Sequence, residues 1–222
     1  MLVLGIDDSG RGPAIGPMIM AGALLKKEDE EKLKKLGVKD SKKLTHKRRE
    51  MLAEEIKKIA VGYEIFVIYP DEIDSRASAG LNLNKIEAIK AADIINKFNK
   101  GEKMTVIVDC PSNNIPKWKE YLKSHVTKTE NLDFLVEHKA DFNHVACSAA
   151  SILAKVQREN EVELIKKRIG KDFGSGYTSD PITQKFLEEH YKDHKKDGIF
   201  RETWQTLKNN HAKKEQKSIG EF

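Results

Sequence analysis

Short apolar runs alternate along the chain with longer segments whose apolar residues recur every three to four positions. The short runs predict buried strands, and the longer segments predict helices with one apolar face. The predicted strands cover residues 2–6, 15–25, 63–69, 104–108 and 132–137. The predicted helices cover residues 28–36, 83–98, 115–124, 142–169, 183–194 and 203–214, and one more begins after Thr45. A Gly/Pro turn separates the first two strands, which we expect to pair as a hairpin.

Helix-start signals support several of these boundaries. Thr45 can act as an N-cap, and Asn84 and Glu87 are spaced like a capping box. Asp180 followed by Pro181 is typical of an N-cap and a first helical turn. Strands that alternate with helices predict an α/β domain with a mixed sheet, in which one antiparallel hairpin precedes β-α-β crossovers. No strand is predicted beyond about residue 178, so we expect a helical appendage there.

Composition and cysteine usage exclude several classes of protein. The 222 residues fit one large domain, or a domain with an appendage. The two cysteines, Cys110 and Cys147, have no C-x-x-C partner, which excludes a disulfide framework and a Cys-ligated zinc site. The longest charge-free stretch, 12–25, is shorter than the roughly 20 apolar residues of a membrane span. A signal peptide requires basic residues before its apolar run, and none precedes the first apolar run here. We therefore expect a cytoplasmic protein without a membrane partner.

The charge of the chain hints at an anionic partner. Lys and Arg number 40 against 35 Asp and Glu, a net charge of +5. Basic residues gather between Lys39 and Arg49, where Asp40 is the one acid. A cluster of this kind attracts nucleic acid. The plainer alternative is the solvated start of a helix.

Four acidic residues lie where chemistry is expected. Asp7 and Asp109 each follow a predicted strand, Asp8 adjoins the first, and Asp141 precedes the long helix at 142–169. In open α/β sheets ligands bind outside the carboxyl ends of the strands, so these carboxylates could converge. Taken singly, each has a plainer interpretation, as the end of a strand or as an N-cap.

Together the four acids predict a cation site. Carboxylates crowded in a cleft repel one another, and their pKa values rise unless cations neutralise them. Oxygen ligands favour Mg²⁺ or Mn²⁺ over zinc or copper. Two such ions roughly 4 Å apart can activate a water and stabilise the leaving oxygen of a phosphodiester.

Five sequence blocks in fixed order resemble one known family. The first, I-D-D-S-G-R-G-P at 6–13, is similar to the I-D-E-A-G-R-G-P opening of ribonuclease HII. The blocks D-S-K-K-L-T, H-K-A-D, S-A-A-S-I-L-A-K and G-S-G-Y-T-S-D-P follow at 40–45, 138–141, 148–155 and 174–181. The resemblance runs from residue 2 to about residue 207, and the archaeal branch of the family is the most similar.

The resemblance implies both a fold and a reaction. The fold would be ribonuclease H-like, a five-stranded mixed sheet flanked by helices, with a C-terminal helical region. The reaction would be cleavage of the RNA strand of RNA–DNA hybrids, and incision on the 5′ side of ribonucleotides embedded in duplex DNA. Such cleavage leaves 3′-hydroxyl and 5′-phosphate ends. The implied boundaries are a catalytic domain at 1–175, a helical substrate-binding region at 176–215 and a tail at 216–222.

The family also implies roles for individual residues. Gly10, Arg11 and Gly12 look like the loop that senses the ribose 2′-hydroxyl, because glycines let the backbone approach the sugar closely. Tyr177 resembles the family tyrosine that packs on the deoxyribose after the ribonucleotide. A plain turn and an ordinary loop tyrosine are the alternatives. The acids at the family's metal-binding and catalytic positions are Asp7, Asp8, Asp109 and Asp141. The other matched substrate contacts are Ser41, Lys42, Lys43 and Ser148.

Three residues depart from the family pattern. Asp8 stands where the family usually has Glu, so its carboxylate has less reach. We expect the geometry at the metal to change and the preference for Mn²⁺ to become stronger. Ser9 replaces the usual Ala. Thr178 replaces the Pro of G-Y-P-S-D, which frees the backbone beside Tyr177.

The C-terminal residues suggest a partner. Gln216, Ile219 and Phe222 resemble a sliding-clamp-binding peptide that lacks its second aromatic residue; a frayed polar tail is the alternative. We expect a monomer. Two other functions compete with the ribonuclease: a junction resolvase, against which the G-R-G loop argues, and an inert hybrid-binding protein, which Asp8 suggests.

Overall fold

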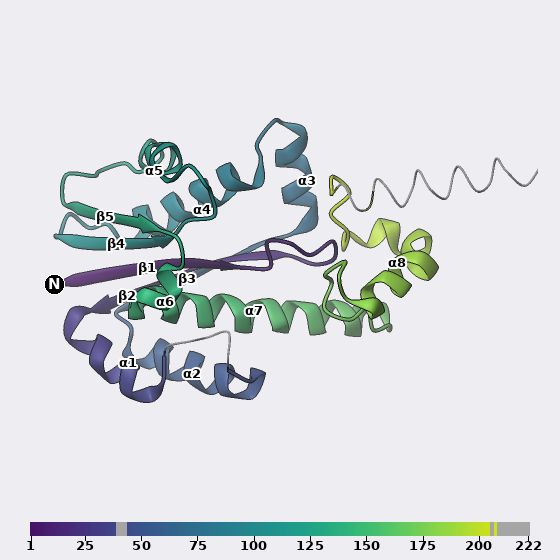
Figure 1. Ribbon diagram of the computed structural model, residues 1–222, viewed down its shortest axis with the longest axis horizontal. Coiled ribbons are helices and arrows are strands. Elements are labelled where there is room, and N and C mark those ends of the chain that lie inside the picture. The colour runs from purple at the N-terminus through teal and green to yellow at the C-terminus, as the bar shows by residue number, and fades with distance from the viewer. Residues whose placement is uncertain (39–43, 205–206, 208–222) are drawn as a thin grey trace, which may run out of the picture. The chain divides into compact units, whose positions relative to one another are not determined.

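The computed structural model describes residues 1–38, 44–204 and 207 (Figure 1). Its contacts divide the chain into two compact units. The first, here called the sheet unit, comprises residues 1–9, the described part of 19–67, and 82–158. The second, the helical unit, comprises 10–18, 68–81 and the described residues from Glu159 onward. This division differs from the sequence boundary at residue 175, which stays a prediction.

A five-stranded mixed sheet forms the first unit and confirms the predicted fold class. Its strands stand in the order β3-β2-β1-β4-β5. They are β1 (Leu2–Ser9), β2 (Met18–Lys26), β3 (Gly62–Ile68), β4 (Met104–Asp109) and β5 (Leu132–Glu137). β1 pairs with β2 antiparallel, as the predicted hairpin requires. β1 and β4 pair in parallel, as do β4 and β5, so all three strands have their carboxyl ends at one edge of the sheet.

Helices cover both faces of this sheet (Figure 1). The helices of the unit are α1 (Glu30–Leu36), α2 (His46–Ile59), α4 (Leu83–Phe98), α5 (Ile115–Lys123), α6 (Ala140–Asn143) and the first part of α7 (Val145–Ile169). α1, α2 and α7 lie on one face, where their apolar side chains share a core with β2. α4 and α5 lie on the other face, joined by a bond from Trp118 Nε1 to the Asn84 carbonyl (2.8 Å).

The Ala-rich start of α7 lets it pack unusually close to β1. A Cβ atom added at Gly5 would lie 2.0 Å from the carbonyl carbon of Ala146, so no side chain fits there. Alternate residues of a strand share a face, so Asp7 points toward α7 as Gly5 does. This close packing fixes the end of β1 against the helix.

The structure corrects three local predictions. The helix expected at 142–169 is interrupted at His144, whose backbone is extended, because α6 ends there and α7 begins at Val145. Pro70 ends a strand as expected, but it also begins α3 (Pro70–Ser78), a helix that the sequence analysis missed. The cap of α4 is Asn82, whose side chain accepts from Lys85 N (3.1 Å), and not the Asn84–Glu87 box.

The helical unit contains α3, the rest of α7 and α8 (Pro181–His194). Asp180 caps α8 by accepting from Ile182 N (3.0 Å), as predicted. The loop at 10–18 belongs to this unit: the amides of Ala14 and Ile15 donate to the Gly176 carbonyl (2.9 and 3.3 Å). Its core is apolar and consists of Ala14, Ile15, Val162, Ile165, Phe173, Phe186, Leu187, Tyr191, Ile199, Phe200 and Leu207.

Two regions bear on the remaining expectations. Most of the helix predicted at 203–214 lies outside the described residues. Across residues 1–38, 44–204 and 207, no helix combines the length and apolarity needed to cross a membrane.

Candidate functional site

The parallel strands of the sheet unit bring two of the predicted acids to one edge. The last pair between β1 and β4 is Ile6 with Val108. Asp7 and Asp109 each follow one residue later, at the carboxyl ends of adjacent strands. Asp141 lies in α6, which begins three residues after β5 ends. Strand register therefore accounts for the convergence that the sequence predicted.

Asp7 is the most buried part of this arrangement, with 5% of its surface exposed. Its Oδ1 accepts a hydrogen bond from the Asp8 amide (2.8 Å). Burial raises the pKa of Asp7 well above its usual value, and the negative charges of Asp8 and Asp109 raise it further. The Lys155 ammonium and a hydrogen bond from Ser151 lower it. Asp7 therefore titrates as a member of an acidic cluster that has the Lys155 ammonium beside it.

Asp109 and Asp141 are held by backbone contacts. Asp109 Oδ1 accepts from the Ala140 amide (3.0 Å), which ties the end of β4 to the start of α6. Asp141 is buried, and the Ser148 hydroxyl donates to its carbonyl oxygen. Ser148 is itself only 1% exposed, so it supports Asp141 here. Its contact with a substrate stays a prediction.

One face of α7 supplies three site residues that the sequence analysis missed. Cys147, Ser151 and Lys155 are spaced i, i+4, i+8, which places them on one side of a helix. Lys155 Nζ donates to Ser151 Oγ, and the Cys147 thiol donates to the Ile6 carbonyl (3.1 Å). The helical spacing was visible in the sequence, but it does not reveal which face meets the acids.

The charges of three of the acids all act on the Cys147 thiol. Burial raises its pKa well above the usual value, and the charges of Asp7, Asp109 and Asp141 raise it further. Asp8 acts on Asp7 in the same way. All four predicted acids therefore act on one small region of the sheet unit. A buried thiol with a raised pKa is unreactive, so we assign Cys147 a packing role.

Glu137 is a fifth carboxylate at this edge of the sheet. It pairs with Asp109 in the β4–β5 ladder. Its Oε1 accepts from Asn143 Nδ2 (2.8 Å) and lies 3.1 Å from His144 Nε2. These contacts link β5 to the break between α6 and α7, which gives Glu137 a structural role.

The donor set fits a hard divalent cation in kind. All four candidate ligands are carboxylates, which suit Mg²⁺ or Mn²⁺. Burial raises the pKa of Asp7 first, and the charges of Asp8 and Asp109 raise it further; a bound cation would favour the ionised form. The carboxylates do not form a finished cage: within the described ranges, no three His, Cys, Asp or Glu side chains are already arranged to hold an ion. Their chemistry and their positions at the strand ends are what suit them to bind an ion.

The helical unit brings together two residues predicted to recognise the substrate sugars, Gly12 and Tyr177. A Cβ atom added at Gly12 would lie 3.3 Å from Tyr177 Cε1, so the tyrosine ring lies beside Gly12 and leaves little room for a side chain there. Gly176, which precedes Tyr177, has a left-handed backbone (φ 81°), and a Cβ there would lie 2.5 Å from the Ile15 carbonyl oxygen. Both glycines thus permit close approach of the loops that carry Gly12 and Tyr177.

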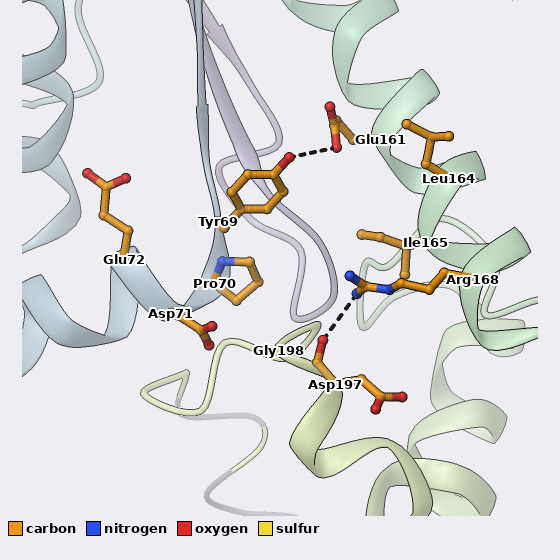
Figure 2. Close-up of a pocket in the computed structure, with 10 residues that line it drawn as sticks. All are labelled: Tyr69, Pro70, Asp71, Glu72, Glu161, Leu164, Ile165, Arg168, Asp197 and Gly198. Atoms are coloured by element: carbon orange, nitrogen blue, oxygen red, sulfur yellow. Dashed lines mark hydrogen bonds between the residues drawn. The ribbon is translucent and has the colours of Figure 1, made fainter.

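Figure 2 shows a separate pocket of about 630 Å³ within the helical unit. Tyr69 donates to Glu161 Oε2 (3.2 Å), and Arg168 Nη2 donates to the Asp197 carbonyl (3.1 Å). Burial raises the pKa of Tyr69, and the charge and hydrogen bond of Glu161 raise it further. No residue predicted for the site lines this pocket, so it does not coincide with the predicted chemistry.

Six predicted site residues lie outside the part of the chain that the structure describes. They are Ser41, Lys42, Lys43, Gln216, Ile219 and Phe222.

Comparison with known proteins identifies related sequences along the whole chain. The family model described as Ribonuclease HII matches residues 4–207. The chain is 39% identical to the Ribonuclease HII of Pyrococcus furiosus over 227 aligned positions, which cover 100% of this chain and 98% of that protein.

Solved structures show the same similarity. The ribonuclease H2 of Pyrococcus horikoshii OT3 superposes with a TM-score of 0.86 and 36% identity, over 96% of this chain and 98% of that one. The RNase HII of Archaeoglobus fulgidus, solved as a complex with PCNA, superposes with a TM-score of 0.82 and 39% identity, over 94% and 96% of the two chains.

Proposed function

The chain belongs to the ribonuclease HII family, and from this premise we propose how its residues cut and read a substrate. The family membership makes it a metal-dependent endoribonuclease that degrades the RNA strand of RNA–DNA hybrids. We propose that it also incises duplex DNA on the 5′ side of embedded ribonucleotides. The observation that carries the proposal is the cluster of acids at the strand ends around Asp7.

The acids of the sheet unit would perform the cutting step. Asp7, Asp8, Asp109 and Asp141 would hold two divalent ions, Mg²⁺ or Mn²⁺, through their carboxylates. Bound ions of this kind supply Lewis acidity, which activates a water and stabilises the leaving oxygen of a phosphodiester. Addition of water across the P–O3′ bond leaves a 3′-hydroxyl upstream and a 5′-phosphate on the ribonucleotide.

Residues around the acids would keep them ready for this role. Lys155 and Ser151 favour the ionised form of Asp7, which is the form that binds a cation. Ser148 fixes the backbone of Asp141, and the Ala140 amide fixes the carboxylate of Asp109. These contacts hold the carboxylates in place before a substrate arrives, which lowers the reorganisation needed during the reaction.

The loop at Gly10–Gly12 and the ring of Tyr177 would read the substrate. Their proximity in the helical unit supports a joint role, in which the loop detects the ribose 2′-hydroxyl and the ring packs on the next sugar. Ser41, Lys42 and Lys43 would bind backbone phosphates. Phosphate contacts carry no sequence information, which suits an enzyme that acts at any sequence.

The proposal extends to a protein partner, a cellular location and an oligomeric state. A sliding clamp is a partner that fits, since the related RNase HII from Archaeoglobus fulgidus was solved in complex with PCNA. Gln216, Ile219 and Phe222 would form the contact. We place the enzyme in the cytoplasm as a monomer.

The decisive test uses duplex DNA with one embedded ribonucleotide and Mg²⁺ or Mn²⁺. We expect wild type to incise 5′ of the ribonucleotide, and Asp7→Asn to lose roughly 100-fold or more of the rate, since metal chemistry contributes several kcal/mol. Asp133→Asn is the matched control, because Asp133 is an exposed acid of β5. Binding without incision in wild type would favour the inert hybrid-binding alternative. Cleavage of a four-way DNA junction instead would favour a resolvase.

A further inference from the structure

A fully buried arginine holds the reading loop from behind. Arg201 has 0% of its surface exposed and lies in none of the motifs that the sequence analysis singled out. Three nitrogens of its guanidinium donate to three different carbonyls of one loop. Nη2 donates to Gly10 (2.6 Å), Nη1 to Arg11 (2.9 Å) and Nε to Gly16 (3.0 Å). Because a buried charge is unfavourable unless it is hydrogen-bonded, these carbonyls also explain why the arginine is tolerated.

Trp204 completes the contact. Its Nε1 donates to the Gly12 carbonyl (3.3 Å), and the guanidinium carbon of Arg201 lies 5.0 Å from the centroid of its ring. The Arg201 amide also donates to the Ala14 carbonyl (3.0 Å), which aligns the two segments. Arg201 and Trp204, here called the carbonyl clamp, thus hold the three consecutive carbonyls of 10–12.

The clamp determines where the amides of the loop point. In a planar trans peptide the C=O and N–H groups face opposite ways. Since the Gly10 and Arg11 carbonyls face Arg201, the N–H groups of Arg11 and Gly12 face away from it. A cation bonded to a carbonyl also polarises the peptide, which makes its N–H a stronger donor. Gly12 is exposed, so its N–H is an oriented and strengthened donor at the surface of the loop.

We propose that Arg201 and Trp204 are positioning residues for recognition of the ribose 2′-hydroxyl. Arg201 sets the direction of the Gly12 amide, which donates to the sugar oxygen, and Trp204 fixes the carbonyl of the same residue. Neither side chain touches the substrate. The inference rests on the proposed function, because it assigns the clamp to the reading loop of that enzyme. The recognised group is an oxygen at the 2′ carbon of the nucleotide at the cut.

Arginine suits this role in a way that lysine does not. Its planar fork presents several N–H donors in fixed directions, whereas a lysine ammonium is a single point. Arg201→Lys would keep the charge but could not reach three carbonyls at once. Trp204→Phe would keep the ring beneath the guanidinium and remove only the bond to Gly12. The two variants therefore weaken the clamp to different degrees.

The test measures kcat and KM on two duplexes that differ in one substituent, at a single 2′ carbon. One carries a single ribonucleotide, and the other carries a 2′-fluoro nucleotide at the same position. The ratio of the two kcat/KM values reports discrimination at the 2′ position and does not depend on the fraction of folded enzyme. Tyr191→Phe is the matched control, because it removes a hydrogen bond to Glu202 (2.6 Å to Oε2) in the same unit.

We expect Trp204→Phe to lower the discrimination ratio by about twofold to tenfold, the range for one hydrogen bond. Arg201→Lys should lower it further. It should stay at the wild-type value in Tyr191→Phe. If both clamp variants lose activity equally on the two duplexes, the clamp serves folding alone and the inference is overturned. If wild type cuts neither duplex, the proposed function fails first and the inference falls with it.

Discussion

Asp7 illustrates how a single residue is changed by its neighbours. Its carboxyl is buried beside Asp8 and Asp109, which raises its pKa, while Lys155 and Ser151 work in the opposite direction. The balance leaves a group that holds a proton more tightly in the folded protein than in the unfolded chain. A site of this kind gives up stability in exchange for a place where a cation can bind.

The stability of the metal-free protein should therefore depend on Asp7 with a definite sign. Because the folded pKa lies above the unfolded value near 3.8, the folded state binds more protons and stability falls as pH rises through that interval. At neutral pH, Asp7→Asn should melt at a higher temperature than wild type in the presence of a chelator. The difference should shrink below the unfolded pKa. Thermal melts across pH test this, and a lower Tm for Asp7→Asn at neutral pH would contradict it.

Asp8 allows a second prediction at this scale. It is one methylene shorter than the glutamate usual in the family. We expect Asp8→Glu to lower the ratio of the Mn²⁺-supported to the Mg²⁺-supported rate several-fold, and by no more than about 100-fold, the effect of roughly 1 Å of misplacement. Steady-state rates in each metal measure the ratio. An unchanged ratio and rate would make the substitution neutral.

The proximity of Gly12 and Tyr177 gives a third prediction. A methyl group at residue 12 would lie 3.3 Å from the tyrosine ring, so the ring must give way by a few tenths of an ångström. We expect Gly12→Ala to lower kcat/KM on a single embedded ribonucleotide by roughly tenfold, as small misplacements do. Tyr177→Phe, which keeps the ring, should retain most of the activity. Wild-type kcat/KM in Gly12→Ala would show that the position of the ring is unimportant.

At the scale of helices and strands, the site depends on how closely β1 and α7 pack. The Ala-rich start of α7 and the absence of a side chain at Gly5 bring the helix against the strand that carries Asp7. This contact places Cys147, Ser151 and Lys155 next to the acids. The site therefore depends on a strand–helix contact as much as on its own residues.

A matched pair of glycines tests this packing. A Cβ at Gly5 would meet the Ala146 backbone at 2.0 Å, whereas one at Gly22 of β2 would meet side chains, with Ile94 Cγ2 nearest at 2.4 Å. A side chain can turn aside and a backbone cannot. We expect Gly22→Ala to cost about 1–3 kcal/mol and Gly5→Ala to cost more. Urea denaturation measures both free energies of unfolding, and the reverse order would refute the argument.

Elements were predictable where a local signal existed. The residue patterns located all five strands, and the hairpin followed from the Gly/Pro turn. The sequence analysis does not predict the break at His144, where the ring lies 3.1 Å from Glu137 Oε1, because the apolar pattern does not reveal such a contact. Pro70 predicts the end of a strand, but proline is also favoured at a first helical turn, and this second signal locates α3.

The candidate site was predictable only in part, for a similar reason. Strand-end position and the family motifs pointed to the four acids and to the reading loop. Lys155 and Arg201 act through contacts between segments distant in the sequence, so no local pattern identifies them. The first modulates Asp7 across a helix–strand contact, and the second is 190 residues from the Arg11 carbonyl that it binds.

At the scale of the whole molecule, the proposed function assigns cutting and substrate recognition to different units. The sheet unit carries the acids, and the helical unit carries the reading loop, Tyr177 and the carbonyl clamp. Residue 9 ends one unit and residue 10 begins the other, so the chain passes directly from Asp7 and Asp8 to the loop. This continuity is consistent with the proposal that the first sequence block holds residues for both cutting and substrate recognition.

The central claim is that the four carboxylates bind divalent ions together, and calorimetric titration of Mn²⁺ into the full chain tests it most directly. We expect binding by wild type and by Asp133→Asn. Asp7→Asn and Asp141→Asn should each weaken it at least tenfold, since even the groups that orient a ligand contribute roughly 10- to 100-fold. Wild-type affinity for Mn²⁺ in both Asp7→Asn and Asp141→Asn would contradict the account.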